Sequence, residues 1–215
     1  MGQVTISEFV TDFFKNQPLG RFLEIGANDG CPNDPLEPCW NLLTKGWTGC
    51  YIEPSPIGCN KLITNLIDHK LIQKADIYNF AIGEETGISK LYISRLYPSI
   101  SSLSEGWADH LKQHSNFFNS CNDFLKTEVY VHTTSLPNFF QTAGYDFDFI
   151  SIDIELHAYE LDRYVTQVNF DLFHNLKLIC IEMWDEKYIV PHLSKFGYKK
   201  VLFDSETTTM FFAKI

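Results

Sequence analysis

Short apolar runs alternate with amphipathic stretches along the first part of the chain, and this alternation limits the possible folds more than any other feature. The apolar runs at 21–25, 49–53 and 76–82 have the length and composition of strands. Between them, residues 34–45 and 54–67 carry apolar side chains at helical spacing. Strands that alternate with helices in this way form a parallel sheet with helices on both faces. We therefore predict an α/β fold with a mostly parallel, doubly wound sheet.

Two predicted helices begin at recognisable capping patterns. Thr5 to Glu8 has the form of a capping box, followed by apolar residues on one helical face. Asp34 precedes Pro35 at the start of the next helical pattern, which predicts Asp34 as its N-cap. The middle of the chain at 84–128 is irregular, with a candidate strand at 89–94. Beyond it, we expect further elements in the order helix 135–142, strand 147–153, helix 158–168, strand 176–184, helix 190–196 and a hairpin of 198–203 with 208–215.

Composition and charge exclude several classes of protein. The chain has 17 basic and 27 acidic residues, hence a net charge of −10, and no cluster of Lys or Arg. Such a chain is poorly suited to bind a nucleic-acid backbone. No apolar run approaches the ~18 residues of a membrane span. The six cysteines form no CxxC pair and are expected to be reduced thiols in a cytoplasmic protein, so we predict no nucleic-acid or membrane partner.

The strongest local motif is the segment 24–30, with sequence EIGANDG, which directly follows the first predicted strand. A dinucleotide fingerprint requires glycine at position 28, where this chain has Asn28, so nicotinamide binding is disfavoured. The acid before the glycine turn suits S-adenosylmethionine instead, because Glu24 can hold the ammonium group of that cofactor. Glu53 ends the next strand, where a carboxylate can bind both ribose hydroxyls. The simpler alternative is a plain glycine turn with a solvent-facing acid.

Acidic residues also follow the strand at 147–153. Asp153 and Glu155 lie at its carboxyl end, the edge at which doubly wound sheets bind ligands. They are candidates to face the donor sulfonium or the acceptor, although either could simply cap a helix. His157 is a candidate general base, with a surface position at a helix start as the alternative. Glu182, at the end of the next strand, is a weaker pocket candidate.

Metal-binding patterns are weak. His110 and His114 lie one helical turn apart in a possible helix, but the Glu of a zinc-protease motif is missing. We therefore predict no metal site there. A divalent cation held by Asp153 and neighbouring acids is possible but is not required by the sequence.

Four ordered blocks, at 22–30, 46–54, 81–83 and 147–155, resemble the FkbM-type methyltransferases. The resemblance runs from about residue 20 to the C-terminus. It implies the Rossmann-like class I methyltransferase fold, with about seven strands and a final antiparallel strand. On this basis we expect one domain over residues 1–215, with an N-terminal helix within 1–19 and an acceptor-side insertion at 84–135.

The resemblance further implies methyl transfer from S-adenosylmethionine, with S-adenosylhomocysteine (SAH) as product, to a hydroxyl of a saccharide or small natural-product acceptor. It suggests a catalytic set of Asp153, Glu155 and His157. It also suggests a cofactor set of Glu24, Gly26, Ala27, Asn28, Gly30, Glu53, Pro54, Ala81, Ile82 and Asp153.

One position departs from the pattern of the family. Leu156 stands where the family usually has glycine, and the acid that should follow is displaced. This departure could reshape the acceptor pocket or weaken catalysis. The alternatives are therefore a non-catalytic partner subunit that binds S-adenosylmethionine or a nucleotide and, less favoured, a nicotinamide oxidoreductase.

Overall fold

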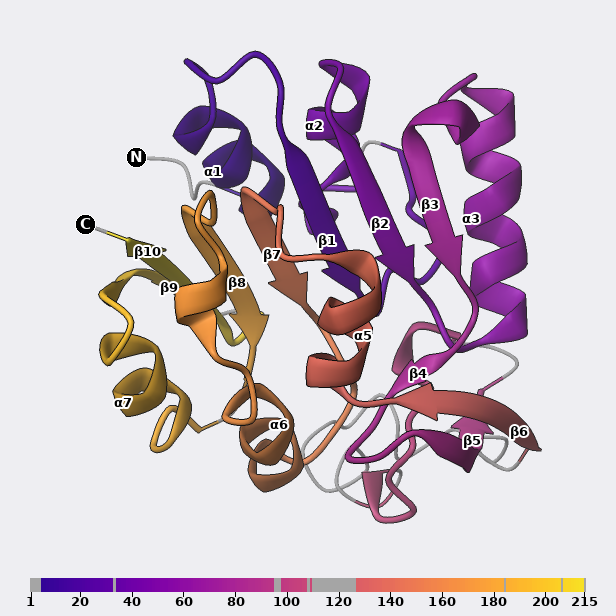
Figure 1. Ribbon diagram of the computed structural model, residues 1–215. Coiled ribbons are helices and arrows are strands. Elements are labelled where there is room, and N and C mark those ends of the chain that lie inside the picture. Colours follow the sequence, from indigo (N-terminus) through magenta and orange to yellow (C-terminus); the bar gives the residue numbers. More distant parts are fainter. Residues whose placement is uncertain are drawn as a thin grey trace.

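A seven-stranded sheet forms the centre of the protein (Figure 1). The structure, a computed structural model, describes residues 5–32, 34–94, 98–107, 109, 127–183, 185–205 and 207–214. The strand order is β3-β2-β1-β7-β8-β10-β9. The first five of these strands are parallel, and β10 runs antiparallel to both β8 and β9. This arrangement confirms the predicted doubly wound sheet with an antiparallel C-terminal pair. The strands are β1 (Arg21–Ile25), β2 (Thr48–Ile52), β3 (Ala75–Tyr78), β7 (Phe149–Ile152), β8 (Leu178–Glu182), β9 (Tyr198–Asp204) and β10 (Thr209–Lys214).

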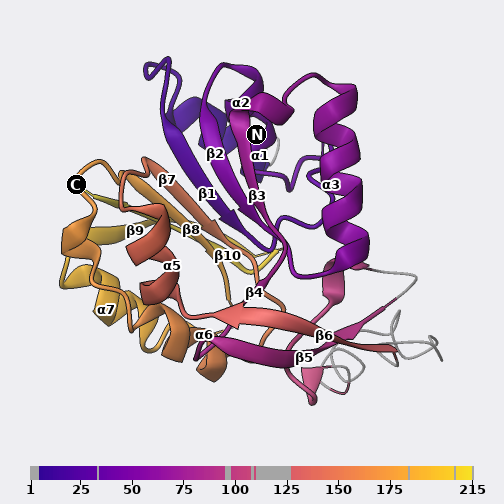
Figure 2. The ribbon, with the colours of Figure 1, turned by 45° about the vertical axis from the view of Figure 1, so that its right-hand side comes forward.

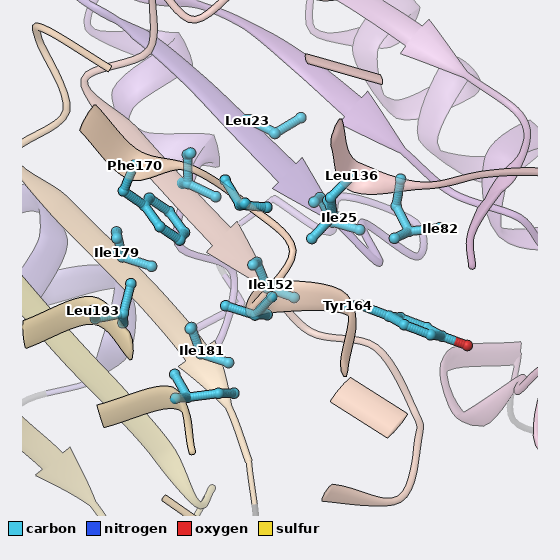
Figure 3. Close-up of a cluster of buried hydrophobic side chains, with 14 of the residues drawn as sticks. Leu23, Ile25, Ile82, Leu136, Ile152, Tyr164, Phe170, Ile179, Ile181 and Leu193 are labelled. Atoms are coloured by element: carbon cyan, nitrogen blue, oxygen red, sulfur yellow. The ribbon is translucent and has the colours of Figure 1, made fainter. Parts of the chain in front are cut away.

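Helices cover both faces of this sheet. Side chains of α1, α2 and α3 form one buried cluster with the strand residues that point to one face of the sheet. Side chains of α5, α6 and α7 form a second buried cluster with the alternate strand residues, which point to the other face. Figure 3 shows the second cluster, in which Leu23, Ile152 and Ile179 of the strands face Leu136 and Leu193 of the helices. The helices are α1 (Ile6–Phe13), α2 (Trp40–Thr44), α3 (Pro56–Asp68), α5 (Leu136–Ala143), α6 (Ala158–Val165) and α7 (Ile189–Ser194), with short 3₁₀ turns η1 (Ile72–Lys74), η2 (Pro98–Ile100) and η4 (Phe170–Leu172).

A second, three-stranded sheet lies beyond the carboxyl ends of the parallel strands (Figures 1 and 2). It consists of β4 (Ala81–Ile82), β5 (Gly87–Ile93) and β6 (Thr127–Thr134) in the order β4-β6-β5. The strand expected near 89–94 corresponds to β5, whereas β6 was not predicted.

The single strand predicted over 76–82 is wrong. The chain leaves the main sheet after Tyr78 and then joins the second sheet as β4. Asn79 marks the break, because its side-chain amide donates to the carbonyl oxygens of Glu53 and Pro54 at 2.8 and 3.2 Å. These bonds tie the turn to the end of β2, so the pairing partner changes from β2 to β6.

The two predicted helix starts have different outcomes. The capping box of Thr5 and Glu8 is present in α1. Asp34 is not the cap of α2, which begins only at Trp40. The Asp34 carboxylate instead accepts a hydrogen bond from Leu36 N at 2.9 Å and closes a turn. Glu37 satisfies the first amides of the helix, because its Oε1 accepts from the backbone N–H groups of Cys39 and Trp40, each at 2.8 Å.

Some predictions fall outside the described residues, namely those on His110, His114 and Cys121. The described cysteines are all free thiols, and only Cys31 among them is exposed. Within the described part of the chain, no helix combines the length and apolar character needed to cross a bilayer.

Candidate active site

The glycine loop after β1 is held tightly against its neighbours. Gly26 has φ of +87°, and its N–H donates to the carbonyl of Ile52 at 2.9 Å. A Cβ on Gly26 would lie 1.6 Å from the carbonyl oxygen of Asp153, so no side chain fits there. Gly30 has φ of +52°, and a Cβ at this position would meet Leu62 Cδ1 at 2.5 Å. Packing against the backbone therefore requires Gly26, whereas the positive φ of Gly30 favours glycine there.

A cavity of about 280 Å³ opens beside this loop, at the carboxyl ends of β1, β7 and β8. The segment 34–38 forms another part of its wall, and Ser99 lines it from the insertion. Ser151, Thr207 and Thr209 also line it. In strand-built α/β proteins this is the edge at which ligands bind.

Carboxyl groups dominate this cavity. Seven lining residues are acidic, and none of the described lining residues is Lys, Arg or His. The cavity therefore favours a cationic guest. The acidic lining residues are Glu24, Asp29, Asp34, Glu37, Asp153, Glu155 and Glu182.

Three of these acids gather beyond β7 and β8. Asp153 is open to solvent in the cavity, yet the surrounding protein desolvates it and raises its pKa to about 6. Glu182 is hydrogen-bonded to Asp153; burial, and then the charges of Asp153 and Glu155, raise the pKa of Glu182 to about 10. Burial and the charge of Asp153 raise the pKa of Glu155 to about 8. At neutral pH this group therefore holds protons that isolated carboxylates would release.

A second acidic group lies deeper, below the glycine loop. Glu24, Glu37 and Cys39 are buried, and each brings one potential ligand atom within 4.8 Å of the others. Burial, and then the neighbouring Glu37, raise the pKa of Glu24 well above its usual value. Burial also raises the pKa of Glu37 to about 7. The three side chains fit either a shared proton or a bound cation.

Glu53 supports the glycine loop from β2. Its two carboxylate oxygens accept hydrogen bonds from the backbone N–H groups of Asn28 and Ser55, both at 2.7 Å. Burial raises the pKa of Glu53 to about 7, although these two hydrogen bonds oppose the shift. The carboxylate is 5% exposed and does not line the cavity. Glu53 is thus positioned to fix the loop conformation.

The structure brings most of the candidate residues together, but not all. Of the residues singled out in the sequence, those that line the cavity are Glu24, Gly26, Ala27, Asn28, Gly30, Asp153, Glu155 and Glu182, whereas Glu53, Pro54, Ala81, Ile82 and His157 do not line it. Ala81 and Ile82 are buried in β4. His157 precedes α6, with its ring stacked on Tyr159 and edge-on to Trp107, each at 5.7 Å between centroids.

Several lining residues were missed by sequence reasoning. Glu37 lies within the predicted helix at 34–45, and its distance from Glu24 in the sequence gives no sign of their contact. Thr207 and Thr209 lie where β10 begins. The only feature that could have pointed to them as lining residues is the pairing of β10 with β8, which places Thr209 opposite Glu182.

The strand order, the glycine loop and the acid-lined cavity define a class I, Rossmann-like methyltransferase. The sequence profile described as "Methyltransferase FkbM domain" matches residues 24–161. The chain belongs to this FkbM methyltransferase family, and its cofactor is S-adenosylmethionine.

Solved structures agree on the fold at low sequence identity. The putative methyltransferase yhhF from Escherichia coli is 12% identical with a TM-score of 0.52; the match covers 96% of this chain and 81% of that one. A methyltransferase from Geobacter sulfurreducens is 8% identical with a TM-score of 0.51, covering 97% and 77%. The N-terminal domain of human METTL16, crystallised with SAH, is 12% identical with a TM-score of 0.50, covering 96% and 68%. Among curated proteins, no sequence matches this chain.

Proposed function

We propose that this methyltransferase transfers the methyl group to a hydroxyl of a saccharide or a small natural-product acceptor. The observation that carries the proposal is Asp153, a solvent-accessible carboxyl at the end of β7 whose pKa of about 6 lies near neutrality. A base with such a pKa is largely deprotonated at pH 7 and still takes up a proton readily. The lining residues Ser151, Thr207 and Thr209 each carry a hydroxyl group, which can donate and accept hydrogen bonds and so suits an acceptor with several hydroxyls.

The residues of the cavity also fit the cofactor. S-Adenosylmethionine carries a sulfonium and an ammonium, and the lining is strongly acidic. Glu24 has a buried carboxyl oxygen without a hydrogen-bond partner, which suits the ammonium at the methionine end. The loop at 26–30 would surround that end, and Glu53, through the loop that it orders, would stand nearest the ribose. Ala81 and Ile82, expected near the adenine, would contribute from the start of the second sheet.

In the proposed reaction, the cofactor supplies an already activated methyl group on its sulfonium. Asp153 would accept the proton that the acceptor hydroxyl loses, at a carboxylate oxygen, and release it to solvent. Glu182, hydrogen-bonded to Asp153, would hold the carboxyl of Asp153 in place. Glu155 would line the acceptor end. His157 has no such role in this proposal, because it does not line the cavity.

The alternative of a non-catalytic partner subunit rests on Leu156, which stands where the family usually has glycine. Leu156 is 3% exposed and packs in the buried cluster that includes α5, α6 and α7. It is not among the cavity-lining residues. The departure from the family pattern therefore gives no reason to expect a blocked acceptor pocket.

The test is a transfer assay with radiolabelled S-adenosylmethionine against panels of sugars, aliphatic polyols, phenols, amines and carboxylates, beside SAH titration by calorimetry. We expect transfer to at least one hydroxyl class and micromolar binding of SAH. Binding of SAH with transfer only to amines or carboxylates would contradict O-methylation. Binding of SAH with no transfer to any acceptor would favour the partner-subunit alternative.

A further inference from the structure

Two buried carboxyls meet at the inner end of the cavity. Glu24 is 4% exposed and Glu37 is 8% exposed, and both line the cavity wall. The position of Glu37 is fixed, because its Oε1 accepts two backbone hydrogen bonds of 2.8 Å, from Cys39 and Trp40. The side chain of Glu37 is also hydrogen-bonded to that of Glu24. Glu37 therefore holds Glu24 from the side of the segment that leads into α2.

Two buried polar atoms in this region lack a partner within the described part of the chain. They are Glu24 Oε2 and the hydroxyl oxygen of Tyr51. Tyr51 is the direct neighbour of Glu24 in the β1–β2 ladder and shares its face of the sheet. A buried polar atom without a hydrogen bond costs about 1–3 kcal/mol, so such atoms commonly await a ligand or water. Both atoms can accept hydrogen bonds, and an ammonium offers three donors.

We propose that Glu37 is a positioning residue for the amino group of the cofactor: it shares one proton with Glu24, and the bound ammonium group draws the single negative charge of the pair onto Glu24 Oε2. This inference rests on the proposed function, which places the methionine end of the cofactor at Glu24. Loss of the Glu37 side chain would leave Glu24 without its hydrogen-bond partner, and two ionised carboxyls would repel each other in a buried setting.

The surroundings of the pair add no positive charge among the described residues. The groups that face it are Cys39 before α2, Tyr51 on β2, Cys180 on β8, Asp153 after β7 and Asp34 in the turn. All of these groups are neutral or negative, so none of them can compensate the negative charges of Glu24 and Glu37 in place of the shared proton. A cationic ligand is then the partner that stabilises the ionised form.

The experiment compares two ligands that differ at the amino-acid end. SAH carries the amino group, whereas 5′-methylthioadenosine keeps the adenosine and sulfur but lacks that group. We expect Glu37→Leu, which removes both the shared proton and the hydrogen bond to Glu24, to weaken SAH binding at least tenfold and to change methylthioadenosine binding less than twofold. Glu37→Gln should bind SAH within about threefold of the wild type, because its amide oxygen can accept from Cys39 N and Trp40 N and its amide N–H can donate to Glu24 in place of the shared proton. Glu128→Gln, an exposed acid on β6 that pairs with Lys90, is the matched control.

The wild-type protein provides a second measurement that needs no variant. We expect the ratio of SAH affinity to methylthioadenosine affinity to fall as the pH is lowered below about 7, because the pair then takes up a second proton. In Glu37→Gln this fall should move to lower pH, because the charge of Glu37 that raises the pKa of Glu24 is gone.

Three results would overturn the inference alone while SAH still binds the wild type. One is equal weakening of both ligands, which indicates a purely structural role. Another is unchanged SAH binding in Glu37→Leu. The third is a stoichiometric divalent metal in the purified protein that is lost in both Glu37→Gln and Cys39→Ser, since the cluster would then be a metal site. Failure of the wild type to bind either ligand would instead overturn the proposed function, and this inference with it.

Discussion

Gly26 and the carbonyl oxygen of Asp153 lie so close that a Cβ on the glycine would come within 1.6 Å of that oxygen. The loop after β1 and the chain after β7 therefore cross in direct contact. The backbone N–H of Asp153 also donates to the carbonyl of Ile25 at 2.9 Å, which fixes the crossing from the other side. The proposed base and the glycine loop are thus parts of one rigid junction.

The first prediction concerns this junction. Gly26→Ala places a methyl group on backbone atoms at φ of +87°, and we expect it to destabilise the fold by more than about 4 kcal/mol. Gly144→Ala is the matched control, because Gly144 has φ of +85° but nothing within 4 Å of a Cβ, so it should cost only about 1–2 kcal/mol. Urea unfolding measures both, and equal losses would contradict the close contact.

The second prediction separates Asp153 from His157 as the base. We expect Asp153→Asn to lower kcat at least 100-fold on the acceptor found in the transfer assay, because an amide cannot take the proton. His157→Gln should change kcat less than fivefold, because His157 does not line the cavity. A larger effect of the histidine substitution on kcat, with SAH affinity unchanged, would show that the loops rearrange around His157 during turnover.

Glu53 is expected to affect the adenosine end of the cofactor. The Glu53 carboxylate accepts hydrogen bonds from two backbone N–H groups, each at 2.7 Å. In Glu53→Gln, one of these N–H groups would face the side-chain amide nitrogen and lose its acceptor. The loop around Asn28 should loosen, and SAH and methylthioadenosine should both bind about tenfold more weakly, a loss of about 1.4 kcal/mol. Calorimetry measures both ligands. Loss of SAH binding alone would instead connect Glu53 with the methionine end.

The acidic cavity also predicts how stability depends on pH. Burial raises the pKa of Glu37 to about 7, of Glu155 to about 8 and of Glu182 to about 10 in the folded protein. Between pH 4.5 and 8 these groups bind more protons in the folded state than in the unfolded state, so they contribute stability at low pH that is lost as pH rises. We expect the melting temperature of the ligand-free protein to fall from pH 5 to pH 8.

A variant tests the origin of that slope. Glu182→Gln removes one titrating group and keeps a hydrogen-bond donor for Asp153, so it should raise the melting temperature at pH 8 and flatten the profile. Glu128→Gln, on the distant β6, should leave the profile unchanged. A melting temperature that rises steadily to pH 8 in the wild type would show that the cavity acids ionise without cost.

The order of strands and helices could be predicted from the sequence because each element carries a local signal. The runs at 21–25 and 49–53 match β1 and β2 within one residue, and Ser135 caps α5 where the helical pattern begins. The break after Tyr78 could not be predicted, because it depends on the contact of Asn79 with the end of β2. The alternation of β6, in which Val131 and Thr133 are buried, is plain only once its partner β5 is known.

In the candidate site, too, residues with a local sequence signal could be predicted, whereas those placed by tertiary contacts could not. Glu24, Gly26 and Asp153 lie at strand ends, where the fold rule itself places a ligand, and the structure brings them together. Glu37 is near Glu24 only because the segment before α2 folds back over β1, and that contact leaves no periodic or spacing signal. Glu53 carries the expected acid at the expected strand end, yet its oxygens are engaged by backbone N–H groups, which a sequence pattern does not reveal.

The last prediction concerns Leu156, which replaces the glycine usual in the family. Leu156 is 3% exposed and belongs to the buried cluster that includes α5, α6 and α7. Leu156→Ala should therefore lower the free energy of unfolding by about 2–5 kcal/mol. Leu19→Ala, at a side chain that is 67% exposed, should change it by less than about 0.5 kcal/mol. Because Leu156 does not line the cavity, the folded variant should keep its affinity for SAH and its kcat when assayed well below its melting temperature. A folded Leu156→Ala protein with wild-type stability but altered acceptor preference would show that Leu156 shapes the acceptor pocket.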